Sequence, residues 1–252
     1  MDNEILRQIK ERKSVRAFSP EKITEEEKEL ILDAAIQAPS AGNQQLYTIL
    51  DITDQKIKEE LAELCDHQPF IGKAPLVLVF LADSRRWMQV YQAAGIQPRN
   101  PRQGDAVLAV ADACIAAQNA AVAAWSMGIG SCYIGDVLEN REKMCRLLKL
   151  PEYVMPAVML VLGRPVQQQK DRRKPARFSR EYLVQENTYK DMTGEEHKKE
   201  LCRRAAADKK EDFDFDQWVK AFEKRKYDSA FSREMSRSVS EYLKEYEIVE
   251  TE

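Results

Sequence analysis

Histidine is scarce in this chain, and its cysteines lack paired spacing. Only His67 and His197 occur among 252 residues, which excludes a histidine-rich metal site, so we expect no bound metal. The cysteines, Cys65, Cys114, Cys132, Cys145 and Cys202, are odd in number and form no CxxC pair. This pattern is typical of reduced thiols rather than of a disulfide framework, so we expect a cytoplasmic protein.

We also expect neither a membrane span nor a secretory leader. No apolar run approaches the ~20 residues of a membrane span, so we expect no membrane partner. The N-terminus, Met1-Asp2-Asn3-Glu4, is acidic and leads into an amphipathic segment, unlike a signal peptide. Lys and Arg number 39 against 42 Asp and Glu, and the resulting net charge of -3 does not suit a polyanion-binding chain.

What remains is a composition typical of a soluble globular protein. Hydrophobic residues make up 44% and charged residues 32% of the chain, which favours a sizeable core beneath a heavily charged surface. The length of 252 residues allows one or two domains.

Helical and strand patterns mix along residues 1–163. Thr24 followed by Glu27 is a capping box, and Asp54 is a second N-cap candidate. We expect helices over 4–12, from Thr24, from Asp54, over 105–127 and over 141–150, and strands over 46–52, 76–81, 131–134 and 157–162. The stripe Leu30, Ile31, Ala34 and Ala35 should be the buried face of the second helix. This mixture predicts an α+β or α/β sandwich with a central sheet.

The helix expected over 105–127 is apolar nearly all round, which predicts deep burial or a subunit interface. Beyond Pro165 the composition changes. Residues 164–180 hold seven basic side chains and one acidic one, and the polar, helical remainder has few apolar anchors, such as Trp218, Tyr242 and Tyr246. Such a tail should pack on the body or on a second subunit.

A tight basic group leaves the first helix. Arg12, Lys13 and Arg16 surround Ser14, and guanidinium, ammonium and hydroxyl groups together can bind a phosphate dianion. Taken alone, the group is as well explained by cations at the negative end of a helix dipole.

Two further segments could line a flat, polar ligand. Ser40, Asn43 and Gln45 lie in a loop between a helix and a strand, and amides both donate and accept; an ordinary polar loop has the same composition. Gly128-Ile129-Gly130 fails the dinucleotide fingerprint, because Tyr133 occupies the place of the third glycine and the segment runs from helix to strand. Its glycines could let backbone approach a ligand or cap a helix.

In order and spacing, four segments resemble the FMN-dependent nitroreductase family, especially its larger NADPH-preferring nitroreductase and flavin reductase branch. These are 12–16, 39–45, 128–135 and Gly163-Arg164-Pro165. The resemblance implies a nitroreductase-like sandwich of α+β class, with a central mixed β-sheet flanked by helices. It also implies an FMN-binding domain over 1–190 and a helical C-terminal extension over 191–252.

The same resemblance implies which residues bind the cofactor. Arg12, Lys13, Ser14 and Arg16 would hold the FMN phosphate, completed by Lys174 or Arg177. The flavin ring would meet Ser40, Asn43, Gln45, Gln68 and the backbone of Tyr133, Ile134 and Gly135. Arg225 and Lys226 are candidates for the phosphate of the nicotinamide nucleotide.

The implied activity is flavin chemistry in a homodimer that joins through the long central helices. NADPH or NADH would reduce FMN, and a nitroaromatic, a quinone or free flavin would reoxidise it by a ping-pong mechanism. No catalytic side chain is then required. Two alternatives stay open: a non-catalytic flavin-binding protein, and a nucleic-acid-binding module that uses residues 164–180. The second lacks aromatic residues interleaved with its charges.

Overall fold

The computed structural model describes residues 3–247. The chain divides into two compact units, one running to Arg172 and resuming at Arg233, the other comprising Arg173–Ser232. The FMN-binding domain predicted over 1–190 and the C-terminal extension predicted over 191–252 stay predictions.

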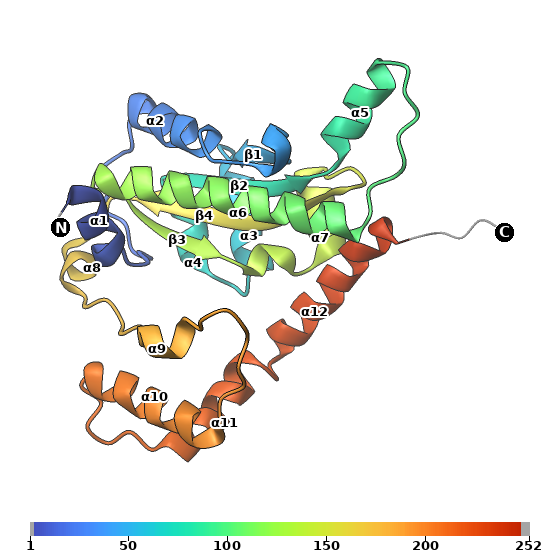
Figure 1. Ribbon diagram of the computed structural model, residues 1–252. Coiled ribbons are helices and arrows are strands. Elements are labelled where there is room, and N and C mark those ends of the chain that lie inside the picture. The colour runs from blue at the N-terminus through green and yellow to red at the C-terminus, as the bar shows by residue number, and fades with distance from the viewer. Residues whose placement is uncertain (1–2, 248–252) are drawn as a thin grey trace. The chain divides into compact units, whose positions relative to one another are not determined.

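A four-stranded sheet forms the centre of the first unit (Figure 1). Its order is β1 (Tyr47–Asp51), β2 (Leu76–Asp83), β4 (Val154–Gly163) and β3 (Gly130–Ile134). All three strand pairs are antiparallel, so the mixed sheet that the family resemblance implied is corrected for the named strands. A parallel pairing occurs at the isolated bridge between Ser14 and Ser131.

The two inner strands are buried along their whole length, as their continuous apolar runs predict. Because successive side chains point to opposite faces, Leu78 and Phe80 join one core cluster while Val77 and Val79 join the other. The sheet is therefore the middle of three layers.

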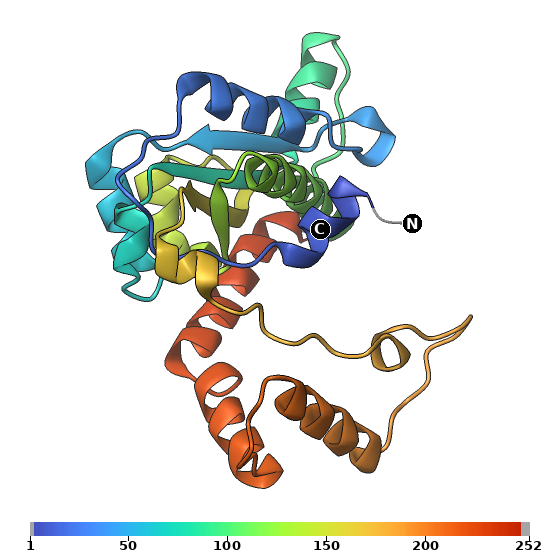
Figure 2. The ribbon, with the colours of Figure 1, turned by 90° about the vertical axis from the view of Figure 1, so that its left-hand side faces the viewer.

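Helices α2 (Glu25–Ile36) and α6 (Gln103–Ser126) cover one face of the sheet (Figure 2). The predicted capping box is confirmed: the Thr24 side chain accepts from the Glu27 N–H and the Glu27 carboxylate accepts from the Thr24 N–H. Ile31 and Ala35 are buried as predicted, but Leu30 is 53% exposed. It lies one position off the buried stripe.

The other face is covered by α3 (Gln55–Leu64), α4 (Pro69–Gly72) and α7 (Arg141–Leu148). The N-cap predicted at Asp54 is confirmed, because its carboxylate accepts from the N–H groups of Lys56 and Ile57. Leu61, Ile71 and Met144 carry these helices into the core.

Helix α6 spans 24 residues and is as apolar as predicted, so that by length and composition alone it could cross a membrane. Nine of its residues, among them Ala109, Ala113 and Ala120, are nevertheless buried within this unit. A core helix of a globular protein has the same character. Its exposed residues include Val107, at 67%, and Ile115, at 42%.

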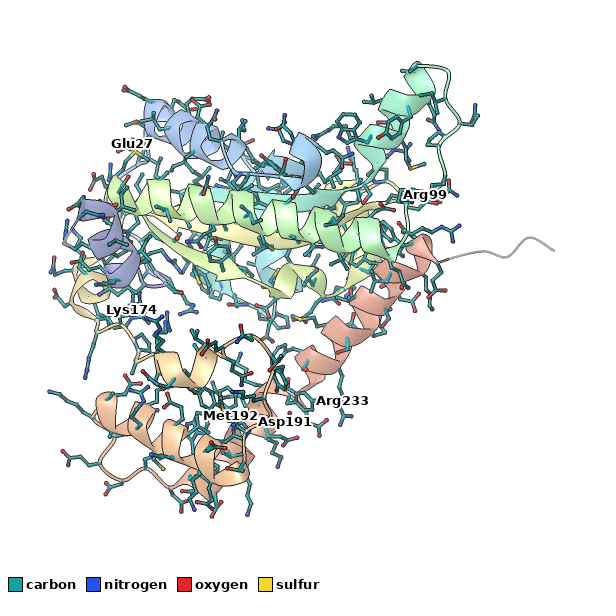
Figure 3. All side chains as sticks on the ribbon, viewed as in Figure 1. Glu27, Arg99, Lys174, Asp191, Met192 and Arg233 are labelled. Carbon is teal, nitrogen blue, oxygen red and sulfur yellow. The ribbon has the colours of Figure 1, made fainter. Side chains whose placement is uncertain are left out.

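The remaining elements of the first unit are short. They are α1 (Glu4–Glu11), η1 (Ala41–Asn43), α5 (Arg85–Ala93), η2 (Asp136–Leu138), α8 (Gln167–Asp171), the part of α12 (Ala230–Leu243) from Arg233 onward, and η3 (Lys244–Tyr246). Arg99 lies in the loop after α5 (Figure 3). Its guanidinium bonds the Asp105 carboxylate at 2.6 Å. Tyr242 and Tyr246 are almost fully buried, so this end of the tail packs on the body as predicted.

The second unit consists of α9 (Arg180–Leu183), α10 (Gly194–Ala207), α11 (Phe215–Lys226) and the start of α12. The buried Glu200 joins two of its segments, accepting from Ser179 N at 2.6 Å and from Arg203 Nη2 at 2.7 Å. Trp218 stacks on Phe222 with ring centroids 4.7 Å apart.

Candidate functional site

The basic segment after α1 lies against strand β3. Val15 is fully buried, and its N–H donates to the carbonyl of Ser131 at 2.9 Å. Ser14 forms a parallel bridge with Ser131. Because side chains of an extended chain alternate, Ser14 and Arg16 point away from the side on which Val15 is buried.

The cations of this segment gather near Cys132 and Tyr133. The Arg12 guanidinium lies 5.8 Å from the centroid of the Tyr133 ring, within cation–π range. Burial raises the pKa of the Cys132 thiol, and Arg16, Ser14 and Arg12 lie close enough to oppose that rise. Three of the four predicted phosphate ligands thus share one location with two residues of β3.

Lys13 and Arg172 connect this segment to the end of α8. The Lys13 ammonium donates to the carbonyl oxygens of Lys170, at 2.6 Å, and of Arg172. The Arg172 guanidinium in turn donates to the Ser14 carbonyl at 2.5 Å. Arg172 was not among the predicted ligands. A basic run was the only sequence signal, and it did not distinguish Arg172 from its neighbours.

Lys174, Arg177, Arg225 and Lys226 belong to the second unit, and their predicted roles stay predictions. Within that unit the Arg225 guanidinium lies 5.4 Å from the Phe222 ring, and the Lys226 ammonium lies 5.0 Å from the Phe231 ring.

Gln68 is attached to the segment that follows β3. Its side-chain NH₂ donates to Asp136 Oδ2 at 2.7 Å and to the Cys65 carbonyl at 2.8 Å. Asp136 follows Gly135 directly, so Gln68 lies beside the backbone predicted to contact the flavin. His67, by contrast, is a surface residue that pairs with Glu63.

Tyr133, Ile134 and Gly135 end β3 and offer different groups. Burial raises the pKa of Tyr133, whose hydroxyl lies 3.1 Å from Gln118 Oε1 and donates to it. The Ile134 side chain is buried. Gly135 is exposed, and a Cβ at this position would find nothing within 4 Å, so its backbone is open to a ligand.

The loop that contains Ser40, Asn43 and Gln45 is held by Asp112 of α6. Asp112 is 3% exposed, and its two carboxylate oxygens accept from Ala41 N at 2.9 Å and from Leu46 N at 3.2 Å. Ser40 Oγ accepts from Gln45 N at 3.0 Å, which tightens the loop further. Asp112 escaped the sequence analysis, although a lone carboxylate in an apolar helix was a usable signal.

Within a single chain, the predicted site segments contact different sides of α6. Asp112 holds the 40–45 loop, while Gln118 contacts Tyr133. These two residues are six positions apart, which is about 120° around a helix. The structure therefore brings together Arg12, Ser14, Arg16, Arg172 and Tyr133. Gly135 follows two positions after Tyr133, Gln68 is joined to Asp136, and the 40–45 loop is attached elsewhere.

The residues that converge suit a phosphorylated, planar ligand. Three guanidinium groups and a hydroxyl match a phosphate dianion, and a half-buried amide beside open backbone matches a polar ring edge. Among residues 3–247 there is no group of three or more His, Cys, Asp or Glu side chains placed to hold a metal.

The fold is an α+β sandwich, and the family follows from comparison. The nitroreductase family model matches residues 9–164, so the chain belongs to the nitroreductase family, as its motifs predicted. The match covers the sheet, its helices and the segment around Arg12, and it ends at Arg164.

Named relatives narrow the branch. The chain is similar to an FMN reductase (NADPH) of Bacillus subtilis (strain 168), 32% identical over 189 residues, which are 74% of this chain and 75% of the relative. It is also similar to an oxygen-insensitive NADPH nitroreductase of Salmonella typhimurium, 34% identical over 180 residues, or 71% and 72% of the two chains. These names confirm the predicted NADPH-preferring branch.

The solved structures extend the likeness beyond the family domain. The structure of B. megaterium NfrA2 matches with a TM-score of 0.80 and 27% identity, over 96% of this chain and 98% of that one. B. megaterium NfrA1 matches with a TM-score of 0.81 and 26% identity, over 95% and 98%. The predicted nitroreductase-like sandwich is thereby confirmed.

Proposed function

We propose that this protein is an FMN-dependent NAD(P)H oxidoreductase that reduces small organic acceptors such as nitroaromatics, quinones or free flavin. The observation that carries the proposal is the convergence of Arg12, Arg16 and Arg172 around Ser14, beside the open backbone of Gly135. Family membership and the FMN and NADPH in the names of the relatives support the same chemistry.

Each part of the site has a separable role. The guanidinium groups and the Ser14 hydroxyl would bind the FMN phosphate by charge-assisted hydrogen bonds. Gln68 and the 133–135 backbone would bind the polar edge of the ring. Bound FMN would supply the redox chemistry by accepting a hydride from NAD(P)H and passing electrons to the second substrate. The positive charge contributed by these residues would favour an anionic reduced cofactor.

A second copy of the chain would complete the site. The solvent-exposed stripe of α6 is apolar, with Val107, Leu108 and Ile115 between 42% and 67% exposed, and Ile5 and Ile9 of α1 are also at least half exposed. Apolar faces of this kind mark protein interfaces. In a homodimer joined along α6, the 40–45 loop of one copy would approach the phosphate-binding segment of the other.

The nucleic-acid alternative has less support in the basic stretch than flavin chemistry has in the family. Residues 164–180 are divided between the two units. Arg164 is also committed inside the first unit, where it bonds Glu27 at 2.5 Å and the Met127 carbonyl at 2.6 Å. A flavin-binding protein without turnover is the remaining competitor, and kinetics separate it from an enzyme.

Spectroscopy tests the proposal directly. Protein loaded with excess FMN and desalted should stay yellow, and anaerobic NADPH or NADH should bleach its visible absorption within seconds. Steady-state rates should give parallel double-reciprocal plots, as a ping-pong mechanism requires. Loss of all flavin on desalting would contradict the cofactor assignment, and retained flavin that neither nucleotide bleaches would favour a carrier.

A further inference from the structure

Glu139 is a buried carboxyl group to which the proposed chemistry gives no role. It lies directly after η2 and is only 4% exposed. Its Oε1 receives no hydrogen bond from the described residues of the chain. An ionised carboxylate in that position would be strongly disfavoured, because a buried charge needs donors or a counter-ion. The groups around Glu139 therefore determine whether its carboxyl is protonated.

The groups that act on Glu139 are all acidic. The carboxyl hydrogen-bonds the side chain of Asp136, and Asp66 from the α3–α4 turn and Glu234 from α12 add negative charge. The thiol of Cys65 faces the same two carboxyls from the end of α3. Burial first, and then these neighbours, raise the pKa of Glu139 to about 7. Two carboxyl groups in hydrogen-bond contact must hold a proton between them.

Asp136 also determines how the Gln68 amide is oriented. Both groups that the amide meets, the Asp136 carboxylate and the Cys65 carbonyl, are acceptors, so the side-chain NH₂ must face them. With both of its N–H bonds used, the amide can only accept through Oε1 on its remaining side. A flipped amide would set its own oxygen against two acceptor oxygens.

We propose that Asp136 and Glu139 share one proton and that this pair positions Gln68 so that its carbonyl oxygen accepts a hydrogen bond from a ring N–H of the flavin. The proposal rests on the FMN-binding function above. Glu139 holds the proton in its buried position and donates it to Asp136, and Asp136 Oδ2 accepts from the Gln68 amide. Asp136 and Glu139 are positioning residues that act through Gln68 without touching the cofactor.

A double-mutant cycle on FMN affinity tests the positioning role. Q68A and D136A should each raise the Kd for FMN about 5- to 10-fold at pH 6.5, and D136A should add less than 2-fold in the Q68A background. D136N keeps an acceptor for Gln68 and should stay within 2-fold of the unmodified protein. D33N is the matched control, because Asp33 is exposed on α2 and is not among the groups that act on Glu139.

The pH profile tests the shared proton. The Kd should rise about 3-fold between pH 6 and pH 8.5, because ionisation of Glu139 places a second charge beside Asp136. In E139Q and in D136N it should be flat, since neither variant retains a carboxyl pair. Thermal unfolding at both pH values checks that the variants are folded.

The outcomes separate the two levels of the argument. If the unmodified protein does not bind FMN, or if Q68A binds it normally, the proposed flavin site fails. If Q68A binds weakly but D136A is fully additive with it, or if E139Q retains the pH dependence, the site stands and the proton-sharing pair is overturned.

Discussion

Gly130 and Val15 pack so closely that a Cβ at position 130 would lie 2.5 Å from Val15 Cγ2. Real Cβ atoms do not approach so near, and Val15 is fully buried with no room to retreat. The glycine therefore lets the basic segment 12–16 lie flat on β3. The proposed phosphate ligands can hold their positions only if residue 130 has no side chain.

We expect Gly130→Ala to displace this segment. Overpacking of this kind costs about 1–3 kcal/mol of unfolding free energy, and displaced phosphate ligands should raise the Kd for FMN about 10-fold. Gly104→Ala is the control, because a Cβ there meets nothing within 4 Å and alanine favours a helix. Chemical denaturation and FMN titration measure both effects, and equal behaviour of the two variants would refute the packing argument.

The sequence predicted those features that local patterns encode. The capping box at Thr24, the N-cap at Asp54 and the buried runs of β2 and β4 each depend on residues within one turn or one strand. The family motifs added the basic segment at Arg12, because its spacing is itself local.

Features that depend on contacts between distant segments were missed or displaced. Asp112 bonds residues 66 and 71 positions away, and Gln68 bonds a residue 68 positions away. Arg172 could not be distinguished from Arg177 because several basic residues share one stretch, and only the contact with Ser14 separates them. The antiparallel pairing of the strands likewise depends on how the chain connects one strand to the next. The hydrophobic periodicity of a strand does not reveal its direction relative to its neighbours.

Arg172 gives the second prediction. Its guanidinium bonds the Ser14 carbonyl at 2.5 Å, so removing it should take away a phosphate donor and loosen the segment. A lost charge-assisted bond is worth about 1.5–3 kcal/mol, so Arg172→Ala should raise the Kd for FMN roughly 10- to 100-fold. Arg173→Ala preserves the charge change without this contact and should bind nearly normally. Fluorescence titration measures both Kd values. If Arg173→Ala weakened FMN binding more than Arg172→Ala did, Arg173 and not Arg172 would be the phosphate ligand.

Asp112 provides a prediction about stability. Asp112→Asn exchanges one acceptor oxygen for an NH₂ group, which cannot accept from both Ala41 N and Leu46 N. Leaving one buried N–H unpaired should cost about 1–3 kcal/mol, and hydrogen exchange should rise in the 41–46 loop. Asp33→Asn, on the exposed side of α2, is the matched control. Its free energy of unfolding should stay within about 0.5 kcal/mol of that of the unmodified protein. An unchanged loop in Asp112→Asn would show that the carboxylate does not hold it.

The exposed face of α6 predicts the oligomeric state. Ile115→Lys places a charge in the middle of the proposed dimer contact, where Ile115 is 42% exposed in the single chain. We expect sedimentation to show a monomer and the flavin to be lost with the dimer, because the 40–45 loop of the second copy is then absent. Leu30→Lys adds the same charge at a residue 53% exposed on α2. It should leave the oligomeric state and the flavin content unchanged. If Ile115→Lys remained a dimer, the dimer interface would not include the exposed face of α6.

Two carboxyl groups near the end of the sheet should make stability depend on pH in opposite senses. The pKa of Glu139 is raised to about 7, mainly by burial, so the folded state binds this proton more tightly than the unfolded chain. Its contribution therefore favours folding at low pH and is lost as pH rises from about 4.5 through 7. Glu142 is the reverse case. Hydrogen bonds from Arg237 lower its pKa to about 2, so its contribution is fully present above about 4.5 and is lost as pH falls through about 2.

Thermal unfolding of the cofactor-free protein separates these two groups. Glu139→Gln removes the penalty of a buried charge, so its melting temperature should exceed that of the unmodified protein at pH 8 by about 3–5 °C, and the gap should close near pH 5. Glu142→Gln should be less stable than the unmodified protein at pH 7, and the deficit should be smaller at pH 3, which lies between the two pKa values of Glu142. If Glu139→Gln were equally stabilising at pH 5 and pH 8, its effect would come from packing. The titration of Glu139, and with it the proton shared with Asp136, would then have no support from stability.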